Sequence, residues 1–185
     1  MGRWGESGLN TELKARGIHI AHPILFFRHG ETQWNVEGRY QGSTDTELSP
    51  KGRQQAGSHG PLVQKLCASG VLIRENITLV SSPLKRAVGT AEILHDHLND
   101  GIKAAQTLTI EPGLRELSFG RWEGMTSMEV KAQFYQERKD RKTNRFTFAP
   151  VGGDSMEGRQ DTVLKVLKDL APHTIVVTHS ALLRL

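Results

Sequence analysis

The segment PILFFRHGETQWN, residues Pro23–Asn35, passes without a break from apolar residues to charged ones. Its run Ile24–Phe27 is typical of a buried strand that is covered on both faces. Arg28, His29 and Gly30 follow this run directly. A buried strand has no packing use for a cation and an imidazole at its end. We therefore expect the strand to present Arg28 and His29 to a functional site.

Two further apolar runs have the same form and end in polar residues. Ile77–Ser82 and Thr174–His179 predict strands, and Thr107–Ile110 predicts a weaker one. Segments with helix-start signals lie between them. The expected helices begin at Ser49–Pro50, with a break or kink at Gly57, Gly60 and Pro61, at Ser82–Pro83, and at Ser155. Strands that alternate with helices predict an α/β fold with a largely parallel sheet.

The composition limits the class of protein. A chain of 185 residues with 37% hydrophobic and 24% charged residues suits one globular domain. Its net charge of +4 weakly favours anionic ligands, and no basic module predicts nucleic-acid binding. The single cysteine, Cys67, excludes an intramolecular disulfide and a thiolate metal site, and it fits a reducing, cytoplasmic setting. No apolar run suits a membrane span. Residues 1–21 are expected to be a poorly ordered lead-in to one domain over residues 22–185.

Polar side chains gather where the predicted strands end. Arg28 and His29 follow the first strand, Arg86 lies after the second, and His179 and Ser180 follow the last. The carboxyl ends of the strands border the ligand crevice of an open α/β sheet, so these side chains should meet there. Arginine forks bind phosphate oxygens, and a helix start adds backbone N–H donors. This set predicts a phosphate pocket in which a histidine serves as general base, hydrogen-bond donor or nucleophile.

The segment LFFRHGETQWN resembles the Arg-His-Gly signature of the histidine phosphatase superfamily, the group that includes cofactor-dependent phosphoglycerate mutases. Later blocks resemble the same family in the family's order: GRYQGSTDTELSPKGRQQA, VSSPLKRAVGTAEIL, LRELSFGRWEGMT, GGDS and VVTHS. One triplet would be a weak signal, but ordered blocks over about residues 24–185 are a strong one. The resemblance implies a three-layer α/β/α fold of the phosphoglycerate mutase type, with a largely parallel, mixed sheet.

The resemblance also implies a role for each matching residue. His29 would be the nucleophile that becomes phosphorylated, and Glu116 would protonate the leaving oxygen and then activate water. The residues that would hold the phosphoryl group are Arg28, Arg86 and His179. Those expected at the substrate site are Asn35, Gln41, Gly42, Ser43 and Ser180. No metal ion or cofactor is implied, because protein cations stabilise the phosphoryl oxygens.

The implied reaction is hydrolysis of a phosphomonoester on a small phosphorylated metabolite, and two alternatives stay open. A mutase would form the same phosphohistidine but pass the phosphoryl group to a substrate hydroxyl instead of water. The second alternative is a protein that binds phosphorylated ligands without turnover. The block ELSFGRWEGMT favours the phosphatase branch, since a His-Tyr-Gly form of this block is familiar in the mutases.

Two departures from the family pattern concern the end of the chain. Ser180 stands where the family usually has glycine after its second catalytic histidine. Leu185 comes six residues after His179, where family members normally continue through a helix and further sheet-edge structure, so the C-terminus is short for the family. A missing helix would expose apolar surface near Leu182, Leu183 and Leu185. A homodimer is left open.

The basic segment 131–145 has two interpretations. Runs of charge usually form a solvated face. This run also lies between the Glu116 block and GGDS, where the family commonly carries substrate-specifying insertions. In that case it would be a lid that meets a second anionic group of the substrate through Arg138, Lys139, Arg141, Lys142 or Arg145.

Overall fold

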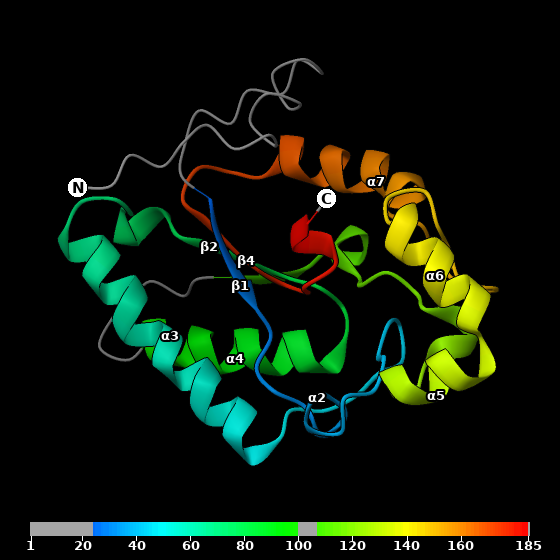
Figure 1. Cartoon of the computed structure of the whole chain (residues 1–185). Helices are drawn as coiled ribbons and strands as arrows, with labels where there is room; N and C mark the ends of the chain where they lie inside the picture. The colour runs from blue at the N-terminus through cyan, green and yellow to red at the C-terminus, as the bar shows by residue number, and fades with distance from the viewer. Residues whose placement is uncertain (1–23, 100–106, 185) are drawn as a thin grey trace.

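The computed structural model describes residues 24–99 and 107–184 (Figure 1). At its centre is a four-stranded sheet in the order β1-β4-β2-β3, and each strand pair within the described residues is parallel. The strands are β1 Leu25–Arg28, β2 Thr78–Ser81, β3 Leu108–Ile110 and β4 Thr174–Thr178. The prediction of an α/β fold with a largely parallel sheet is confirmed.

Helices cover both faces of the sheet. α3 (Pro50–Ala68) and α4 (Lys85–Asn99) lie on one face, and α7 (Met156–Asp169) lies on the other (Figure 1). The shorter elements are α2 Gln33–Val36, α5 Ser127–Gln133 and α6 Tyr135–Thr143, with the 3₁₀ turns η1 Arg74–Asn76, η2 Pro112–Leu114, η3 Gly120–Trp122 and η4 Leu182–Arg184. The expected three-layer α/β/α architecture is therefore confirmed.

Each face of the sheet has its own apolar core. Leu79 of β2 packs in one cluster with Leu94 of α4, while its neighbour Val80 packs in the other with Val163 of α7. Successive side chains of a strand point to opposite faces, so one strand feeds both clusters. All five residues of β4 are buried, which is why its sequence TIVVT carries no charge.

The register of the strands aligns the polar residues that follow them. Arg28 pairs with Thr178, and Ser81 pairs with Val177. The sheet ladder continues one residue further, since the His29 N–H donates to the Thr178 carbonyl at 3.0 Å. The ends of β1, β2 and β4 therefore lie at the same level of the sheet.

The predicted cover on both faces of the first strand is wrong for Phe26, which is 36% exposed. β1 is the edge strand of the described sheet, so only one of its sides pairs with another strand there. Phe27 points the opposite way, is buried, and stacks on the ring of His59 with 4.2 Å between centroids.

The helix α3 begins as predicted, with the Ser49 hydroxyl as its N-cap. Of the predicted break or kink, the break does not occur. The helix runs on through Gly57, Gly60 and Pro61. Gly60 lies against His97 of α4, where a Cβ atom would come within 2.9 Å of the His97 Cβ. Packing between two long helices thus outweighs the low helix propensity of these residues.

The helix α4 begins at Lys85, so the predicted start at Ser82–Pro83 is wrong. The Ser82 N–H instead extends the sheet ladder, because it donates to the Val177 carbonyl at 3.0 Å. The predicted start at Ser155 is confirmed, since its hydroxyl accepts from the Gly158 N–H at the beginning of α7.

The two ends of the chain are only partly described. The lead-in predicted for residues 1–21 and the last residue, Leu185, lie outside the described residues. Leu183 is 42% exposed, as expected near the end of the chain, whereas Leu182 is buried in the core on the α7 side, contrary to that expectation. Within residues 24–99 and 107–184, no helix has the length and apolar character needed to cross a membrane.

Candidate active site

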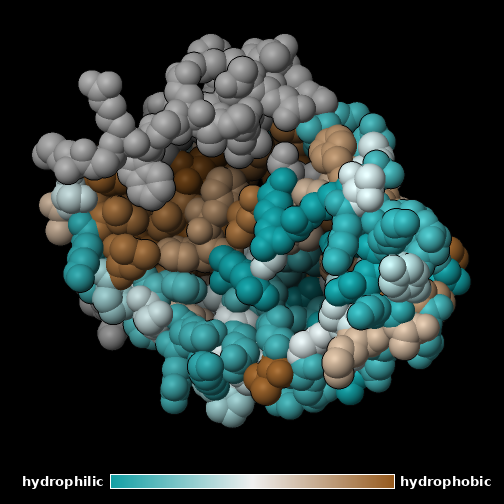
Figure 2. Space-filling view, in the orientation of Figure 1, coloured by the Kyte–Doolittle hydropathy of each residue, from teal (hydrophilic) through white to brown (hydrophobic). Residues whose placement is uncertain are grey.

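A cavity of about 250 Å³ opens at the carboxyl ends of β1 and β4. Figure 2 shows a hollow rimmed by hydrophilic residues in the region between η4, α2 and α6. The charged residues of the cavity wall are Arg28, Arg39, Arg86, Arg141, Arg145, Arg184 and Glu116. The other lining residues are His29, Asn35, Tyr40, Gln41, Gly42, Phe119, Ser180 and Ala181. Six arginines against one glutamate make this a site for an anionic ligand.

His29 is buried beside His179, with 5.1 Å between the two ring centroids. Its Nδ1 lies 2.7 Å from the Gly30 carbonyl oxygen. A carbonyl can only accept, so Nδ1 carries the proton and Nε2 keeps its lone pair. Burial, followed by the charges of Arg86 and Arg28, lowers the pKa of His29 to about 3. The imidazole is therefore neutral near pH 7, which is the state that a nucleophile requires.

Arg86 lies in the first turn of α4 and is almost fully buried. Its Nη1 donates to the Thr44 carbonyl at 2.8 Å, and its Nη2 donates to the Gly42 carbonyl at 2.7 Å. Burial lowers the pKa of Arg86 to about 10, so the guanidinium still carries its charge near pH 7. The Nε–H is buried without a partner among the described residues, and a phosphate oxygen is an acceptor that would satisfy it.

His179 follows β4 and is fully buried. Its Nε2 lies 2.7 Å from the Ser82 hydroxyl oxygen, which in turn accepts from the Leu84 N–H at 3.3 Å. The Ser82 hydroxyl can therefore donate to Nε2, which places the ring proton on Nδ1. Nδ1 is buried without a partner among the described residues. Burial, with the charge of Arg86 next in importance, holds the pKa of His179 well below its ordinary value. The ring is thus a neutral N–H donor beside His29.

Glu116 is the acid of the cavity and is buried. Its Oε1 accepts from the N–H groups of Leu117 at 3.1 Å and Leu182 at 3.3 Å, and its Oε2 accepts from the Ala181 N–H at 3.2 Å. Burial raises the pKa of Glu116, although these N–H groups and the charge of Arg86 act in the opposite direction. The carboxyl group therefore keeps its proton to a higher pH than an exposed glutamate, as a general acid must.

The five residues predicted at the substrate site do not all reach the cavity. Those that line it are Asn35, Gln41, Gly42 and Ser180. Ser43 is not among the lining residues, since its N–H and its hydroxyl both donate to Glu123, at 2.9 and 3.0 Å. Of the three residues predicted to hold a phosphoryl group, Arg28 and Arg86 line the cavity. His179 is not among the lining residues, but its ring lies beside that of His29 and its Nδ1 has no partner among the described residues.

Asn35 and Gln41 line the cavity, and the amide oxygen of each side chain already accepts hydrogen bonds from neighbouring residues. The Asn35 Oδ1 accepts from the Thr32 N–H at 3.1 Å. The Gln41 Oε1 accepts from the hydroxyls of Thr32 at 2.8 Å and Thr46 at 2.6 Å. The N–H₂ groups are left as donors, which again suits an anion.

Glu123 organises the site, and the sequence analysis did not single it out. Its carboxylate accepts hydrogen bonds from the N–H and hydroxyl groups of Ser43 and Thr44, from the Ser118 hydroxyl, and from the Phe119 N–H. Burial would raise the pKa of Glu123, but these bonds outweigh it and lower the pKa. The carboxylate thus joins the loop that holds Arg86 to the loop that carries Glu116. Its place in the block LRELSFGRWEGMT was the available signal.

Four further arginines line the cavity, namely Arg39, Arg141, Arg145 and Arg184. Arg39 pairs with Glu37 at 2.6 Å and donates to the Gly124 carbonyl at 2.7 Å. Arg184 reaches the cavity from η4. Arg141 and Arg145 of the basic segment also line it, and sequence spacing alone had left open whether they faced solvent or a ligand.

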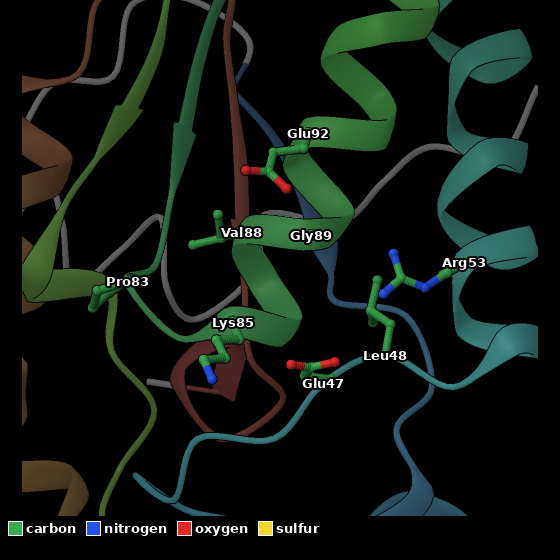
Figure 3. Close-up of a pocket in the computed structure, with 8 residues that line it drawn as sticks. All are labelled: Glu47, Leu48, Arg53, Pro83, Lys85, Val88, Gly89 and Glu92. Atoms are coloured by element: carbon green, nitrogen blue, oxygen red, sulfur yellow. The ribbon is translucent and has the colours of Figure 1, made fainter.

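Another cavity, of about 420 Å³, lies beside the N-terminal half of α4 (Figure 3). Lys85, Val88 and Glu92 come from α4, and Arg53 reaches in from α3 (Figure 3). The charged residues of this cavity are the acids Glu47 and Glu92 and the bases Arg53 and Lys85, so their charges cancel. This cavity therefore lacks the positive excess that distinguishes the site around His29.

The residues around His29 can carry out phosphoryl transfer with protein groups. They provide an uncharged nucleophile, cations and N–H donors for phosphoryl oxygens, and a carboxyl group with a raised pKa for the leaving oxygen. In the part of the chain that the structure describes, no three histidine, cysteine, aspartate or glutamate side chains group as a metal site.

Comparisons with known proteins point the same way. The chain is 34% identical over 147 residues to glucosyl-3-phosphoglycerate phosphatase of Mycolicibacterium vanbaalenii, a match that covers 80% of this chain and 59% of that protein. It is 31% identical over 137 residues to 2,3-bisphosphoglycerate-dependent phosphoglycerate mutase of Dichelobacter nodosus, over 74% of this chain and 52% of that protein. The chain thus spans little more than half the length of these relatives.

A solved structure of a mycobacterial glucosyl-3-phosphoglycerate phosphatase in complex with VO3 superposes with a TM-score of 0.71. The two sequences are 30% identical, over 88% of this chain and 78% of that one. The sequence profile of the histidine phosphatase superfamily (branch 1) matches residues 24–185, the same span that contains every residue of the site. On the fold, the site and this match together, the chain belongs to the histidine phosphatase superfamily, branch 1.

Proposed function

We propose that the protein hydrolyses phosphomonoesters through a phosphohistidine at His29. The observation that carries the proposal is the state of the His29 ring, which is neutral and has a free lone pair on Nε2. A charged imidazole could not attack phosphorus, and the opposite tautomer would turn its proton toward the ligand. The names of the relatives are consistent with this reaction, since they include phosphatases.

In the first half-reaction, Nε2 of His29 attacks phosphorus and the bond from phosphorus to the ester oxygen breaks. Glu116 gives its proton to that oxygen, which leaves as an alcohol. Arg28, Arg86 and His179 hold the phosphoryl oxygens while their negative charge is redistributed.

In the second half-reaction, the Glu116 carboxylate takes a proton from water, and the water oxygen attacks phosphorus. The bond from phosphorus to Nε2 breaks, which releases inorganic phosphate and restores both residues to their starting states. One carboxyl group serves both steps, because the second step is the first in reverse with water in place of the alcohol.

The substrate that we propose is a small phosphorylated metabolite, since the cavity of about 250 Å³ admits a phosphoryl group with a short organic part. The relatives named glucosyl-3-phosphoglycerate phosphatase make that ester one member of the panel to be tested. We also propose a cytoplasmic location, supported by the single cysteine.

The test is the release of inorganic phosphate from a panel of phosphomonoesters in the presence of EDTA. His29→Ala should lower the rate at least about 10⁴-fold. His97→Ala, which removes an exposed imidazole from α4, is the matched control and should leave the rate unchanged. A phosphoryl group on the His29 peptide, stable in alkali and lost in acid, should be found by mass spectrometry of protein quenched during turnover.

The same panel separates the hydrolase from a mutase, which one relative is named as. A mutase interconverts 2- and 3-phosphoglycerate without net release of phosphate. Interconversion at a rate above phosphate release would replace the proposed hydrolase by a mutase. Turnover that survives in His29→Ala would remove the phosphohistidine itself.

A further inference from the structure

The hydroxyl group of Ser82 contacts the second histidine of the site and not the helix that follows it in the chain. Ser82 is fully buried, and the hydrogen bond from its N–H to the Val177 carbonyl fixes its main chain in the sheet. Because α4 begins only at Lys85, the Ser82 hydroxyl is not the N-cap of that helix. Its oxygen lies 2.7 Å from Nε2 of His179. The strand end therefore presents a fixed polar group to the His179 ring.

The direction of this hydrogen bond follows from the other contact of the Ser82 hydroxyl. Its oxygen accepts from the Leu84 N–H at 3.3 Å. An N–H group can only donate, so this contact leaves the hydroxyl proton free for another partner. Among the described residues, Nε2 of His179 is the acceptor within hydrogen-bond distance of that hydroxyl. A buried hydroxyl proton without an acceptor is unfavourable, so Ser82 donates and Nε2 accepts.

Electrostatics keeps the His179 ring neutral but does not select the nitrogen that carries its proton. Burial, followed by the charge of Arg86, lowers the pKa of His179, and the charge of Arg28 acts in the same direction. Either neutral tautomer would meet this condition. Only the tautomer with its proton on Nδ1 allows Nε2 to accept from Ser82. The selection of the tautomer therefore comes from the Ser82 hydroxyl.

The Nδ1–H group of this tautomer is available to a ligand. The His179 ring is fully buried, and its Nδ1 has no partner among the described residues. The ring lies beside that of His29, with 5.1 Å between centroids. A phosphoryl oxygen at His29 is an acceptor that would satisfy the buried N–H group. The opposite tautomer would have a lone pair on Nδ1, which repels phosphoryl oxygens.

We propose that Ser82 is a positioning residue of the phosphoryl site, whose hydroxyl holds His179 in the tautomer that donates from Nδ1 to a phosphoryl oxygen. Ser82 acts through the imidazole and is not itself a donor to the ligand. This inference rests on the proposed function, because it explains how one donor of the same site is prepared. It also gives the Ser82 hydroxyl a role in place of the helix cap that the sequence predicted.

NMR of the histidine rings is the first arm of the test, and it does not depend on turnover. Couplings between the ring protons and the ring nitrogens show which nitrogen carries the proton. The signals of His179 among the eight histidines are identified by their loss in His179→Gln. At about pH 7.5 the proton should be on Nδ1 in the parent protein, and Ser82→Ala should populate both tautomers. A proton on Nε2 in the parent protein would overturn the proposal.

Calorimetric titration with orthovanadate is the second arm. Ser82→Ala should raise the dissociation constant of orthovanadate about tenfold, the size expected for the loss of one hydrogen bond to a charged group. Ser82→Thr keeps a hydroxyl group and should stay within about threefold of the parent protein. Ser81→Ala is the matched control, because Ser81 is equally buried and its hydroxyl donates to the Ser82 carbonyl and not to a histidine. It should also stay within about threefold.

A double-mutant cycle distinguishes positioning of His179 from a general effect on the fold. Because Ser82 acts through His179, Ser82→Ala should weaken orthovanadate binding by less than about twofold in protein that already carries His179→Gln. A tenfold loss in that background would mean that Ser82 acts by another route. An equal loss in Ser81→Ala would likewise refute a specific role for the Ser82 hydroxyl.

Turnover of the phosphomonoester panel separates this proposal from the proposed function. The expected tautomer and orthovanadate results, without release of phosphate from any ester by the parent protein, would support the role of Ser82 and overturn the hydrolase. Hydrolysis by a parent protein whose His179 carries its proton on Nε2 would do the reverse. The two proposals therefore fail separately.

Discussion

His29 owes its predicted reactivity to its surroundings and not to its residue type. The Gly30 carbonyl fixes its tautomer, and burial beside two arginines keeps it uncharged. Glu116 shows the opposite response to the same cavity, since burial raises the pKa of its carboxyl group. One desolvated space thus lowers the pKa of the imidazole and raises the pKa of the carboxyl group, as a nucleophile and a general acid require.

Replacement of Glu116 by glutamine should affect substrates according to their leaving groups. Alkyl phosphates need a proton on the leaving oxygen, so their kcat should fall about 10²- to 10⁴-fold. p-Nitrophenyl phosphate releases a stable phenolate, so its phosphorylation step should slow by less than about tenfold. In the parent protein, turnover of alkyl phosphates should fall as the pH rises through the raised pKa of Glu116. Equal losses on both classes in single-turnover measurements would contradict its role as an acid.

Glu123 should act on phosphate binding through Arg86. In Glu123→Gln, the amide replaces one acceptor oxygen with donors, so hydrogen bonds from Ser43, Thr44 or Phe119 are lost and the loop that holds Arg86 loosens. The inhibition constant of orthovanadate should therefore rise about tenfold or more. Glu92→Gln is the control, because it neutralises a carboxylate in the cavity of Figure 3. It should leave the inhibition constant of orthovanadate unchanged. An unaltered inhibition constant in a folded Glu123→Gln would show that Glu123 does not position Arg86.

At the scale of elements, the start of α3 braces the loop that follows β1. Gly52, in the first turn of α3, lies so close to this loop that a Cβ atom would come within 2.0 Å of the Glu31 carbonyl oxygen. The Ser49 N–H also donates to that carbonyl, at 2.8 Å. The helix therefore touches the chain two residues beyond His29, and its position sets the loop.

Two glycine substitutions in α3 should have opposite effects. Gly52→Ala places a methyl group against backbone that cannot move aside, so it should lower the free energy of unfolding by about 1–3 kcal/mol and reduce turnover. In Gly57→Ala the added methyl group would lie no closer than 3.6 Å to the His97 ring. This substitution should raise the free energy of unfolding by up to about 1 kcal/mol. Urea denaturation followed by circular dichroism measures both. A Gly52→Ala protein as stable as Gly57→Ala would show that the close approach is not rigid.

For the whole molecule, buried histidines make stability depend on pH. In the folded chain, the pKa values of His29, His59 and His179 are all lowered, chiefly by burial. The unfolded chain binds protons at these rings below about pH 6.5, whereas the folded chain does not. Their contribution is fully present above that pH and is lost as the pH falls toward about 3, where His29 titrates. The raised pKa of Glu116 makes stability fall as the pH rises, which is the opposite dependence, but it is one group against three histidines.

The free energy of unfolding should therefore fall between pH 7.5 and pH 5.5, with a slope approaching about 1.4 kcal/mol per pH unit for each of the buried rings of His29 and His179, and a smaller slope for the half-exposed ring of His59. Urea denaturation at several pH values measures it. His29→Asn should reduce the slope of the free energy of unfolding against pH by the contribution of one histidine. His97→Asn, at an exposed position, should leave the slope unchanged. A stability that is constant over this range would mean that the rings take up protons in the folded state.

Much of the fold and site could be predicted, because strands and their polar ends leave strong local patterns. The apolar runs gave the strands, and the residues after them, such as His29 and His179, meet as parallel topology requires. Errors arose where distant packing decided the outcome. Gly60 stays helical because His97 needs its small volume, and Ser82 extends a strand because β4 lies beside it.

The parts of the site that the sequence left undetermined depend on three-dimensional proximity. Glu123 binds donors from the distant loop at Ser43, and no spacing rule links these positions. Arg141 faces the cavity through its stacking on Phe119, whereas its neighbour Lys139 on the same helix is exposed. A run of charge contains no information about which of its members turn inward.

The hydrogen bond from the His29 N–H to the Thr178 carbonyl places the proposed nucleophile through main-chain atoms alone. Main-chain geometry is the same for many side chains, so this placement survives sequence drift in both strands as long as their register holds. Arg141 of α6, by contrast, lines the same cavity through its side chain. Substitutions in that one helix can therefore alter the lining of the cavity while the backbone hydrogen bond that places His29 is kept.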